Sequence, residues 1–347
     1  MALTLDRRTA DSSSFIALYW NQAEVESLRN GAGVDTGFKR FDETETGLRL
    51  RHDWLKGPNK TYTAGLDLVE YDDERTPGGG PNAGVVYEKN TEKFYSPYVH
   101  ASRPFGDNIV DGGLRYTYSD QFGDDLSPEI GLVHSVDPSL ALRTRVGHAF
   151  RVPRVNDANA PFATPNPDLE PEDFWEVEFG LNKAFLGKRA IFDAVFWFRE
   201  GDNLIQTVGA GSAAQKVNTG EFEHHGFETT LDVAVHKNWS VFIAGTIQDV
   251  GDEIEVPEKI LDLGVNYKKE RISASLLARY AKDILGNLAT GEKIDDYLVT
   301  NLHFNYQANK NVDVFVDIDN IFDEEYETIL GYPQVPQAVF LGIRGSF

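Results

Sequence analysis

The feature that most constrains this sequence is an alternation of apolar and polar residues with a period of two, which recurs along almost the whole chain. In the segment 311–319, NVDVFVDID, Val312, Val314 and Val316 alternate with acidic residues and one phenylalanine. Successive side chains of a β-strand point to opposite faces, so this period predicts strands with one apolar and one polar face. No segment of any length shows helical periodicity, and we therefore expect an all-β chain.

The alternation predicts about 17 strands. They lie at residues 2–9, 13–23, 43–54, 60–71, 93–103, 108–119, 127–136, 139–149, 173–184, 188–207, 215–235, 239–249, 259–268, 271–280, 295–307, 311–319 and 338–347. Short turns are expected near 10–12, 55–59, 104–107, 137–138, 185–187, 236–238, 269–270 and 308–310. Long connections are expected near 24–42, 72–92, 120–126, 150–172, 208–214, 250–258, 281–294 and 320–337.

Short and long connections thus alternate strictly. Short turns on one rim and long loops on the other are typical of an outer-membrane β-barrel. Lipid can surround the aliphatic faces only if every backbone N–H and C=O group is hydrogen-bonded within a closed sheet. The carboxylates on the opposite faces then point into a hydrated lumen. We predict a single domain over 1–347, an antiparallel transmembrane β-barrel in the outer membrane of a Gram-negative cell.

Composition excludes several functions. The 55 acidic and 33 basic residues give a net charge of −22, which argues against a nucleic-acid partner. Cysteine is absent, and no run approaches the roughly 20 apolar residues of a membrane helix. Neither a serine elbow nor a P-loop nor an HExxH motif occurs, so we predict no enzyme, no cofactor and no metal site.

The number of strands suggests that the segment is incomplete. If the last strand runs down to the periplasm, counting back 17 strands makes the first one run downward as well. A closed barrel whose chain enters from the periplasm starts with an upward strand. We therefore expect an odd number of strands to be missing before Ala2.

Four motifs follow one another along the chain. The stretch 95–153 ends in Arg-x-Pro, here Arg151-Val152-Pro153. An Asn-Pro element and a Glu-x-Gly strand then contribute Asn166, Pro167, Leu169, Pro171, Glu172, Glu178 and Gly180. VNTGEFEHHGFET (217–229) contributes Asn218, Gly226, Phe227 and Glu228. The segment 320–347 contributes Asn320, Phe322, Asp323, Tyr326, Gly331, Tyr332, Pro333, Gly342 and Phe347.

In this order the motifs resemble the β-barrel of TonB-dependent outer-membrane receptors, and the likeness covers nearly the whole chain. The resemblance implies 22 strands and an N-terminal plug, of which the plug and about five strands are not in this sequence. It implies energy-coupled uptake of a scarce nutrient, with a ferric siderophore or a similar metal chelate as the expected cargo. The implied partners are a TonB complex acting through the plug, outer-membrane lipid, and the barrel-assembly machinery reading the strand that ends in Phe347.

Ligand-contact residues are expected on the long loops and at the rim. The candidates are Arg151, Arg154, Phe162, Phe222, Tyr326 and Tyr332. Guanidinium groups suit carboxylate or phosphate ligands, but structural pairing of the arginines with Glu170, Glu172 or Asp173 is the favoured alternative. His224 and His225 are adjacent in an expected strand and point to opposite faces, so they do not favour a haem or metal centre. Haem receptors of the family carry a histidine between the first two motifs, and residues 154–165 contain none.

Three other functions remain open at this point. A passive porin would keep a permanently open polar lumen, and an outer-membrane enzyme would need two carboxylates converging at a rim. A soluble β-rich binding domain would be monodisperse without detergent.

Overall fold

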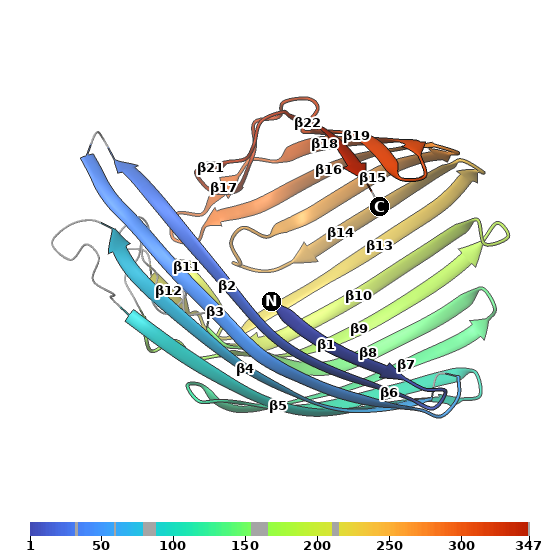
Figure 1. Ribbon diagram of the computed structural model, residues 1–347, viewed down its shortest axis with the longest axis horizontal. Coiled ribbons are helices and arrows are strands. Elements are labelled where there is room, and N and C mark those ends of the chain that lie inside the picture. The colour runs from blue at the N-terminus through green and yellow to red at the C-terminus, as the bar shows by residue number, and fades with distance from the viewer. Residues whose placement is uncertain (32–33, 59, 79–87, 154–165, 210–214, 346–347) are drawn as a thin grey trace. The chain divides into compact units, whose positions relative to one another are not determined.

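The computed structural model describes residues 1–31, 34–58, 60–78, 88–153, 166–209 and 215–345, with side chains described in these ranges except at 25–41 and 75–90. The described residues form 22 strands (Figure 1). None of them belongs to a helix that is long and apolar enough to cross a membrane. The prediction of an all-β chain is confirmed.

The strands have the following bounds. They are β1 (Ala2–Arg8), β2 (Ser12–Gly31), β3 (Val34–Leu55), β4 (Thr61–Gly78), β5 (Glu88–Phe105), β6 (Asn108–Ser119), β7 (Gly123–Asp137), β8 (Leu140–Arg151), β9 (Glu172–Phe185), β10 (Ala190–Asp202), β11 (Ile205–Val208), β12 (Gln215–Asn218), β13 (Phe222–His236), β14 (Trp239–Asp249), β15 (Pro257–Lys269), β16 (Ile272–Asn287), β17 (Glu292–Ile294), β18 (Tyr297–Asn309), β19 (Val312–Asp319), β20 (Glu327–Ile329), β21 (Tyr332–Pro333) and β22 (Ala338–Gly345).

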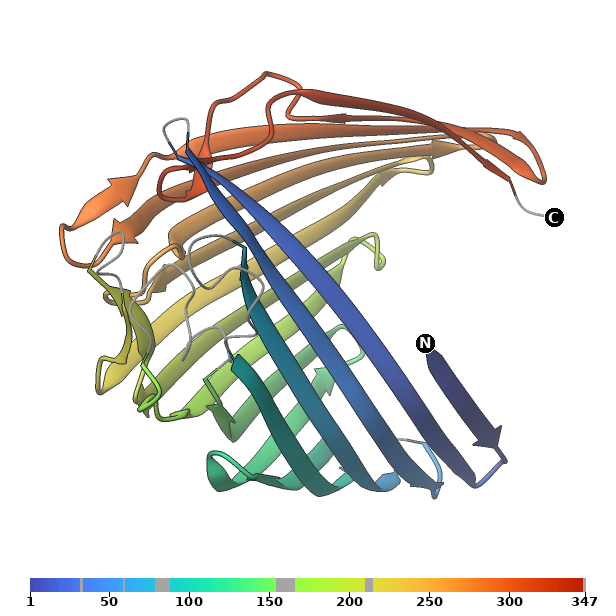
Figure 2. The ribbon, with the colours of Figure 1, turned by 60° about the vertical axis from the view of Figure 1, so that its left-hand side comes forward.

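Eighteen of the described strands belong to one sheet, and the chain divides into two compact units. Of the described residues, the first unit holds 1–132, 146–153 and 166–173, and the second holds 133–145 and 174–345. In the first unit β1 to β6 pair in chain order, each antiparallel to the next. The β2–β3 pairing runs from Ser12 opposite Trp54 to Gly31 opposite Val34, and Figure 2 shows the two strands side by side.

The second unit continues the same antiparallel pattern. Its main pairings join β10 to β13, then β14, β15, β16, β18, β19 and β22 in turn. Two short hairpins, β11–β12 and β20–β21, pair apart from this sheet. Most neighbouring strands of the sheet are therefore successive along the chain and antiparallel, which agrees with the alternation of short and long connections predicted from the sequence.

Every one of the expected strand segments contains a strand of the structure, and β14 has the predicted bounds 239–249. The predicted strands 188–207 and 215–235 are each divided in two, and β17, β20 and β21 lie in stretches predicted as loops. The long connection expected at 24–42 is largely paired strand, and the one expected at 120–126 is only residues 120–122. The alternation alone does not mark where a strand is interrupted, as at 203–204 and 219–221, or where backbone pairing continues without it.

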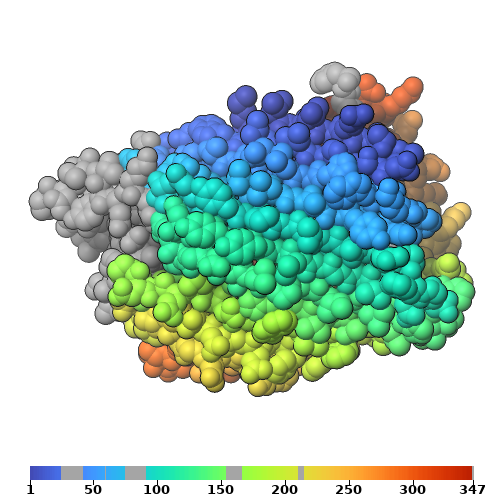
Figure 3. All heavy atoms as spheres, turned by 90° about the horizontal axis from the view of Figure 1, so that it is seen from below, coloured from blue at the N-terminus to red at the C-terminus, as the bar shows by residue number. Residues whose placement is uncertain are grey.

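The two faces of the sheet differ in chemistry. In the first unit the exposed side includes Ile16, Leu18, Val99 and Ile130, which are 41–59 % exposed. The spheres of this unit form adjoining bands from blue to green in Figure 3. The side chains of alternate positions, such as Asp53, Thr63, Ser96 and Thr117, are buried and polar. An apolar surface of this extent marks contact with something other than water.

The same division holds in the second unit. Val339, Leu341 and Ile343 of β22 are 63–75 % exposed, and they lie opposite Ile318, Val316 and Val314 of β19. On the polar face of the sheet, Asp262 of β15 accepts hydrogen bonds at 2.7 and 2.9 Å from Arg279 of β16. The aliphatic side of NVDVFVDID is thus on the exposed face, as the sequence predicted.

Aromatic rings cover glycines of neighbouring strands at several places. The cross-strand pairs are Tyr19–Gly47, Tyr98–Gly65, Trp197–Gly226, Phe242–Gly264 and Phe315–Gly342. A Cβ atom built on Gly226 would lie 2.7 Å from the Trp197 ring and 2.9 Å from Gln248 Cβ. Glycine leaves the space in which these large rings lie flat, which fixes the register of the paired strands.

Candidate functional site

A cavity of about 920 Å³ lies in the first unit, between strands β2 to β6 and the residues around the end of β8. The carboxylates on its wall are Glu43, Glu45, Asp67, Asp72, Asp73 and Glu92, and the guanidinium groups are those of Arg49, Arg115 and Arg151. Arg115 donates a hydrogen bond to Asp67 at 3.0 Å. The wall is rich in charge and suits a hydrated space better than an apolar ligand.

Arg151, a predicted ligand residue, lies on this wall and is also part of an ion pair. Its Nε donates to Glu172 Oε2 at 2.6 Å, and a second guanidinium nitrogen donates to Oε1 of the same carboxylate. The Glu172 side chain is 6 % exposed and that of Arg151 is 43 % exposed. The Arg151–Glu172 ion pair, which the sequence offered as the alternative to ligand binding, is thus present. A role of Arg151 in ligand binding stays a prediction.

The other predicted ligand residues lie apart or outside the described residues. Phe222 packs its ring 6.3 Å from that of Phe174 and 4.9 Å from His224. Tyr326 lies 4.8 Å from the ring of Tyr297, while Tyr332 on β21 is 67 % exposed. Arg154 and Phe162 fall outside the described residues, as does the motif residue Phe347.

Tyr326 and Tyr332 belong to the same local segment. Its backbone is tied together because the Gln334 amide donates to the Tyr326 carbonyl at 2.9 Å. His224 is buried, and its Nδ1 lies 3.7 Å from Glu253 Oε2, whereas His225 is only partly buried. Among the described residues, neither histidine belongs to a group with metal-ligand spacing.

Several motif residues hold backbone in place. Asn320 is 2 % exposed: its Nδ2 donates to the Glu324 carbonyl, and its Oδ1 accepts from the Glu324 amide, both at 2.9 Å. Asn218 donates to the Asn203 carbonyl at 2.8 Å. Asp323 accepts from the Gln337 amide at 2.8 Å. These side chains replace hydrogen bonds that irregular backbone cannot make with itself.

The remaining motif positions are placed as follows. Pro153 is fully buried, Leu169 is 4 % exposed and Phe322 is 73 % exposed. Asn166 Oδ1 accepts a hydrogen bond from the Asp168 amide, Gly180 lies beneath the Arg143 side chain, and Glu178 lies near Arg143 and Arg145. Glu228 lies opposite Val195 and Thr246, Pro167 and Pro171 flank Leu169 in the sequence, and Pro333 ends β21. Pro153 also lies on the wall of the cavity described above, and several of the others shape the connections beside the strands.

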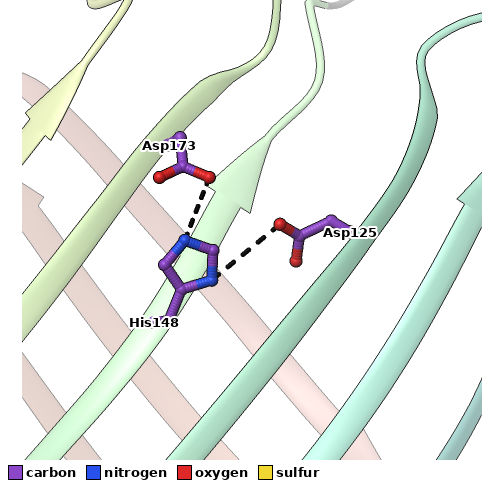
Figure 4. Close-up of side chains that lie close together, drawn as sticks. All are labelled: Asp125, His148 and Asp173. Carbon is purple, nitrogen blue, oxygen red and sulfur yellow. Dashed lines mark hydrogen bonds and ion pairs between the residues drawn. The ribbon is translucent and has the colours of Figure 1, made fainter.

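A second cluster brings together Asp125 of β7, His148 of β8 and Asp173 of β9 (Figure 4). His148 Nε2 lies 2.9 Å from Asp173 Oδ2, which is a hydrogen bond, and Nδ1 lies 3.8 Å from Asp125 Oδ1. One donor atom from each residue lies within 4.8 Å of the other two. The set of one imidazole and two carboxylates is able to hold a divalent metal ion.

Sequence reasoning missed this cluster. Its members are 23 and 25 residues apart along the chain, and only the pairing of three successive strands places them together. The usable signal was an acidic or imidazole residue near the loop end of each of three neighbouring predicted strands.

The chain matches a family model described as TonB dependent receptor-like, beta-barrel over residues 2–321. A curated relative, the vitamin B12 transporter BtuB of Vibrio vulnificus, is 26 % identical over 295 residues, covering 80 % of this chain and 45 % of the relative. The probable TonB-dependent siderophore receptor PiuA of Acinetobacter baumannii is 23 % identical over 186 residues, covering 47 % of this chain and 25 % of the relative. The chain spans about half the length of the curated relatives it matches.

Solved structures agree in fold. The ferric enterobactin receptor PfeA of Pseudomonas aeruginosa has a TM-score of 0.76 at 15 % identity, covering all of this chain and 61 % of the receptor. The copper transporter OprC has a TM-score of 0.78 at 16 % identity, covering all of this chain and 65 % of the transporter. These relatives are receptors and transporters rather than enzymes, which confirms the prediction of a non-enzyme. The chain therefore belongs to the TonB dependent receptor-like β-barrel family.

Proposed function

We propose that this chain is the barrel portion of a receptor in the outer membrane of a Gram-negative cell, and that the receptor takes up a scarce nutrient in an energy-coupled way. The cargo in this proposal is a ferric siderophore or a similar metal chelate. Coupling through a TonB complex, and recognition of the strand ending in Phe347 by the barrel-assembly machinery, belong to the same proposal.

The observation that carries the proposal is the exposed apolar face of the sheet. On β5, exposed aromatic rings lie at Tyr95 and Phe105 on the same face, with exposed Val99 between them. These two rings are ten positions apart in the sequence. A transmembrane strand needs about 9–11 residues to cross the hydrocarbon core, with aromatic girdles at both interfaces. The spacing supports a membrane face of one bilayer thickness.

The named relatives support a metal-chelate cargo. The solved neighbours include a ferric enterobactin receptor and the siderophore receptor PirA of Acinetobacter baumannii. Several curated relatives are vitamin B12 transporters, so a corrinoid is a second cargo within the same mechanism. Arg151, Phe222, Tyr326 and Tyr332 are the proposed contact positions, together with Arg154 and Phe162.

The test is uptake by cells of the source bacterium with and without the encoding gene. Deletion should abolish uptake of one labelled ferric siderophore or of labelled cobalamin, and a plasmid copy should restore it. Dissipating the proton gradient should abolish the same uptake, because the transport is driven. Uptake that survives the uncoupler would point to a passive channel, and unchanged uptake of every chelate would remove the proposal.

A further inference from the structure

We propose that Asp125, His148 and Asp173 form a binding site for a divalent transition-metal ion such as Zn²⁺, resident in the protein and separate from any transported cargo. Figure 4 shows the three side chains converging from β7, β8 and β9. This goes beyond the proposed uptake function and departs from the sequence, which predicted no metal site.

The distances fit two ligands of one metal ion. Ligands bound at about 2.1 Å in tetrahedral geometry lie about 3.4 Å from each other. The separation of His148 Nδ1 and Asp125 Oδ1, 3.8 Å, is close to that spacing and too long for a hydrogen bond. An ion between these two atoms would need little movement of either side chain.

The Asp125 carboxylate is oriented by a further contact. Ser127 Oγ donates to Asp125 Oδ2 at 2.7 Å, which leaves Oδ1 turned toward His148. Metal ligands characteristically carry such outer hydrogen bonds, because these fix the direction of the donor atom.

Burial makes two of the ligands rigid and leaves the third adaptable. The side chains of His148 and Asp125 are 9 % and 14 % exposed, whereas that of Asp173 is 51 % exposed. In the structure Asp173 pairs with His148 Nε2. It can rotate to bring an oxygen to the ion, or stay and orient the imidazole, and either use adds to the affinity.

The donor set selects the class of metal. Imidazole nitrogen suits Zn²⁺, Cu²⁺ and Ni²⁺, while Mg²⁺ and Ca²⁺ prefer sites made of oxygen alone. Two carboxylates and a neutral imidazole carry a charge of about −2, which a divalent ion neutralises. The site would tie three strands together, two of which, β8 and β9, also carry the Arg151–Glu172 ion pair.

The experiment measures Zn²⁺ binding to the purified, tag-free chain in detergent, by isothermal titration and by metal analysis after gel filtration. The variants are His148→Gln and Asp125→Asn, which preserve size. The matched control is His303→Gln, because His303 also pairs with an aspartate, Asp317, on neighbouring strands. Unheated gel mobility reports whether each variant is folded.

The unchanged chain and His303→Gln should bind Zn²⁺ with the same affinity and should melt at a higher temperature when Zn²⁺ is present. His148→Gln and Asp125→Asn should bind at least tenfold more weakly and lose the thermal shift. If the unchanged chain binds no Zn²⁺, or binds it as tightly after both changes, the proposal is wrong. Neither result depends on whether the receptor transports a chelate.

Discussion

At the scale of single residues, the motif positions that look functional in the sequence carry much of the local structure. Arg151 and Glu172, twenty-one residues apart, close on each other across β8 and β9. Sequence reasoning named both residues and weighed their pairing, but it had no means to decide between that pairing and a ligand. The decision rests on burial, since Glu172 is nearly inaccessible and its charge requires a partner.

Arg151→Met should destabilise the protein more than Glu172→Gln. The first change leaves a buried carboxylate without its guanidinium, at a cost of about 1–3 kcal/mol in unfolding free energy. The second leaves a half-exposed guanidinium that water can solvate, so it should cost less. Urea unfolding in detergent measures both. Equal losses of unfolding free energy for the two variants would mean that the burial of Glu172 does not decide the effect. The double variant should lose less unfolding free energy than the two single variants added together.

Asp296, between β17 and β18, makes a pH-dependent contribution. Desolvation opposes its ionisation, but the Asp283 amide at 3.2 Å, Lys282 at 3.3 Å and the Tyr280 hydroxyl outweigh it, so its pKa lies below the ordinary value of 3.8. An acid with a lowered folded-state pKa stabilises the protein above its ordinary pKa, and the contribution is lost as the pH falls through the folded value.

Asp296→Asn should therefore lower stability at pH 6, and its difference from the unchanged protein should shrink as the pH falls through the lowered pKa of Asp296. The measurement is the unfolding free energy as a function of pH, from pH 6 downward. Asp295→Asn removes the same charge one position away and is the charge-matched control. Parallel curves for both variants would show that the contacts of Asp296 add nothing.

At the scale of elements, the strands were predictable because the two faces of the sheet meet different surroundings. The alternation located all the predicted strands of the main sheet, but it failed at the ends of β2, β3 and β4 and in the small hairpins β11–β12 and β20–β21. In these stretches the apolar–polar alternation does not mark where backbone pairing starts or ends. The Asp125–His148–Asp173 cluster was missed for a related reason, since cross-strand register is not encoded in any one strand.

Glycine–aromatic pairs give a test at this scale. Gly264→Ala on β15 places a methyl group inside the Phe242 ring of β14, and the ring must turn away. We expect a loss of about 1–3 kcal/mol in unfolding free energy. Gly245→Ala on β14 meets its nearest atom at 3.8 Å and should be tolerated. Similar losses of unfolding free energy for Gly264→Ala and Gly245→Ala would show that the Phe242 ring is not the reason why glycine is needed at position 264.

At the scale of the whole molecule, the exposed aliphatic face and the charged face imply different solvents on the two sides of one sheet. Leu263 is the central residue of β15, is 44 % exposed, and lies opposite Ile243, which is 40 % exposed. A charge on a lipid-facing side chain near mid-bilayer is costly, whereas the opposite face tolerates it.

Leu263→Arg should lower the unfolding free energy in lipid vesicles by about 2–4 kcal/mol. Thr246→Arg, on the opposite face of the same sheet, should cost much less. Urea unfolding of protein inserted in vesicles compares the two. If the order is reversed, the apolar face does not meet lipid.

The long pairing of β2 with β3 has a consequence for how the protein meets its environment. A protease binds its substrate as a single extended chain, and in this arm the backbone already has a partner as far as Gly31 and Val34. Cleavage of the arm would first require peeling the two strands apart, a step that an ordinary surface loop does not impose. A protease that reaches this segment would thus meet two paired strands rather than a single extended chain.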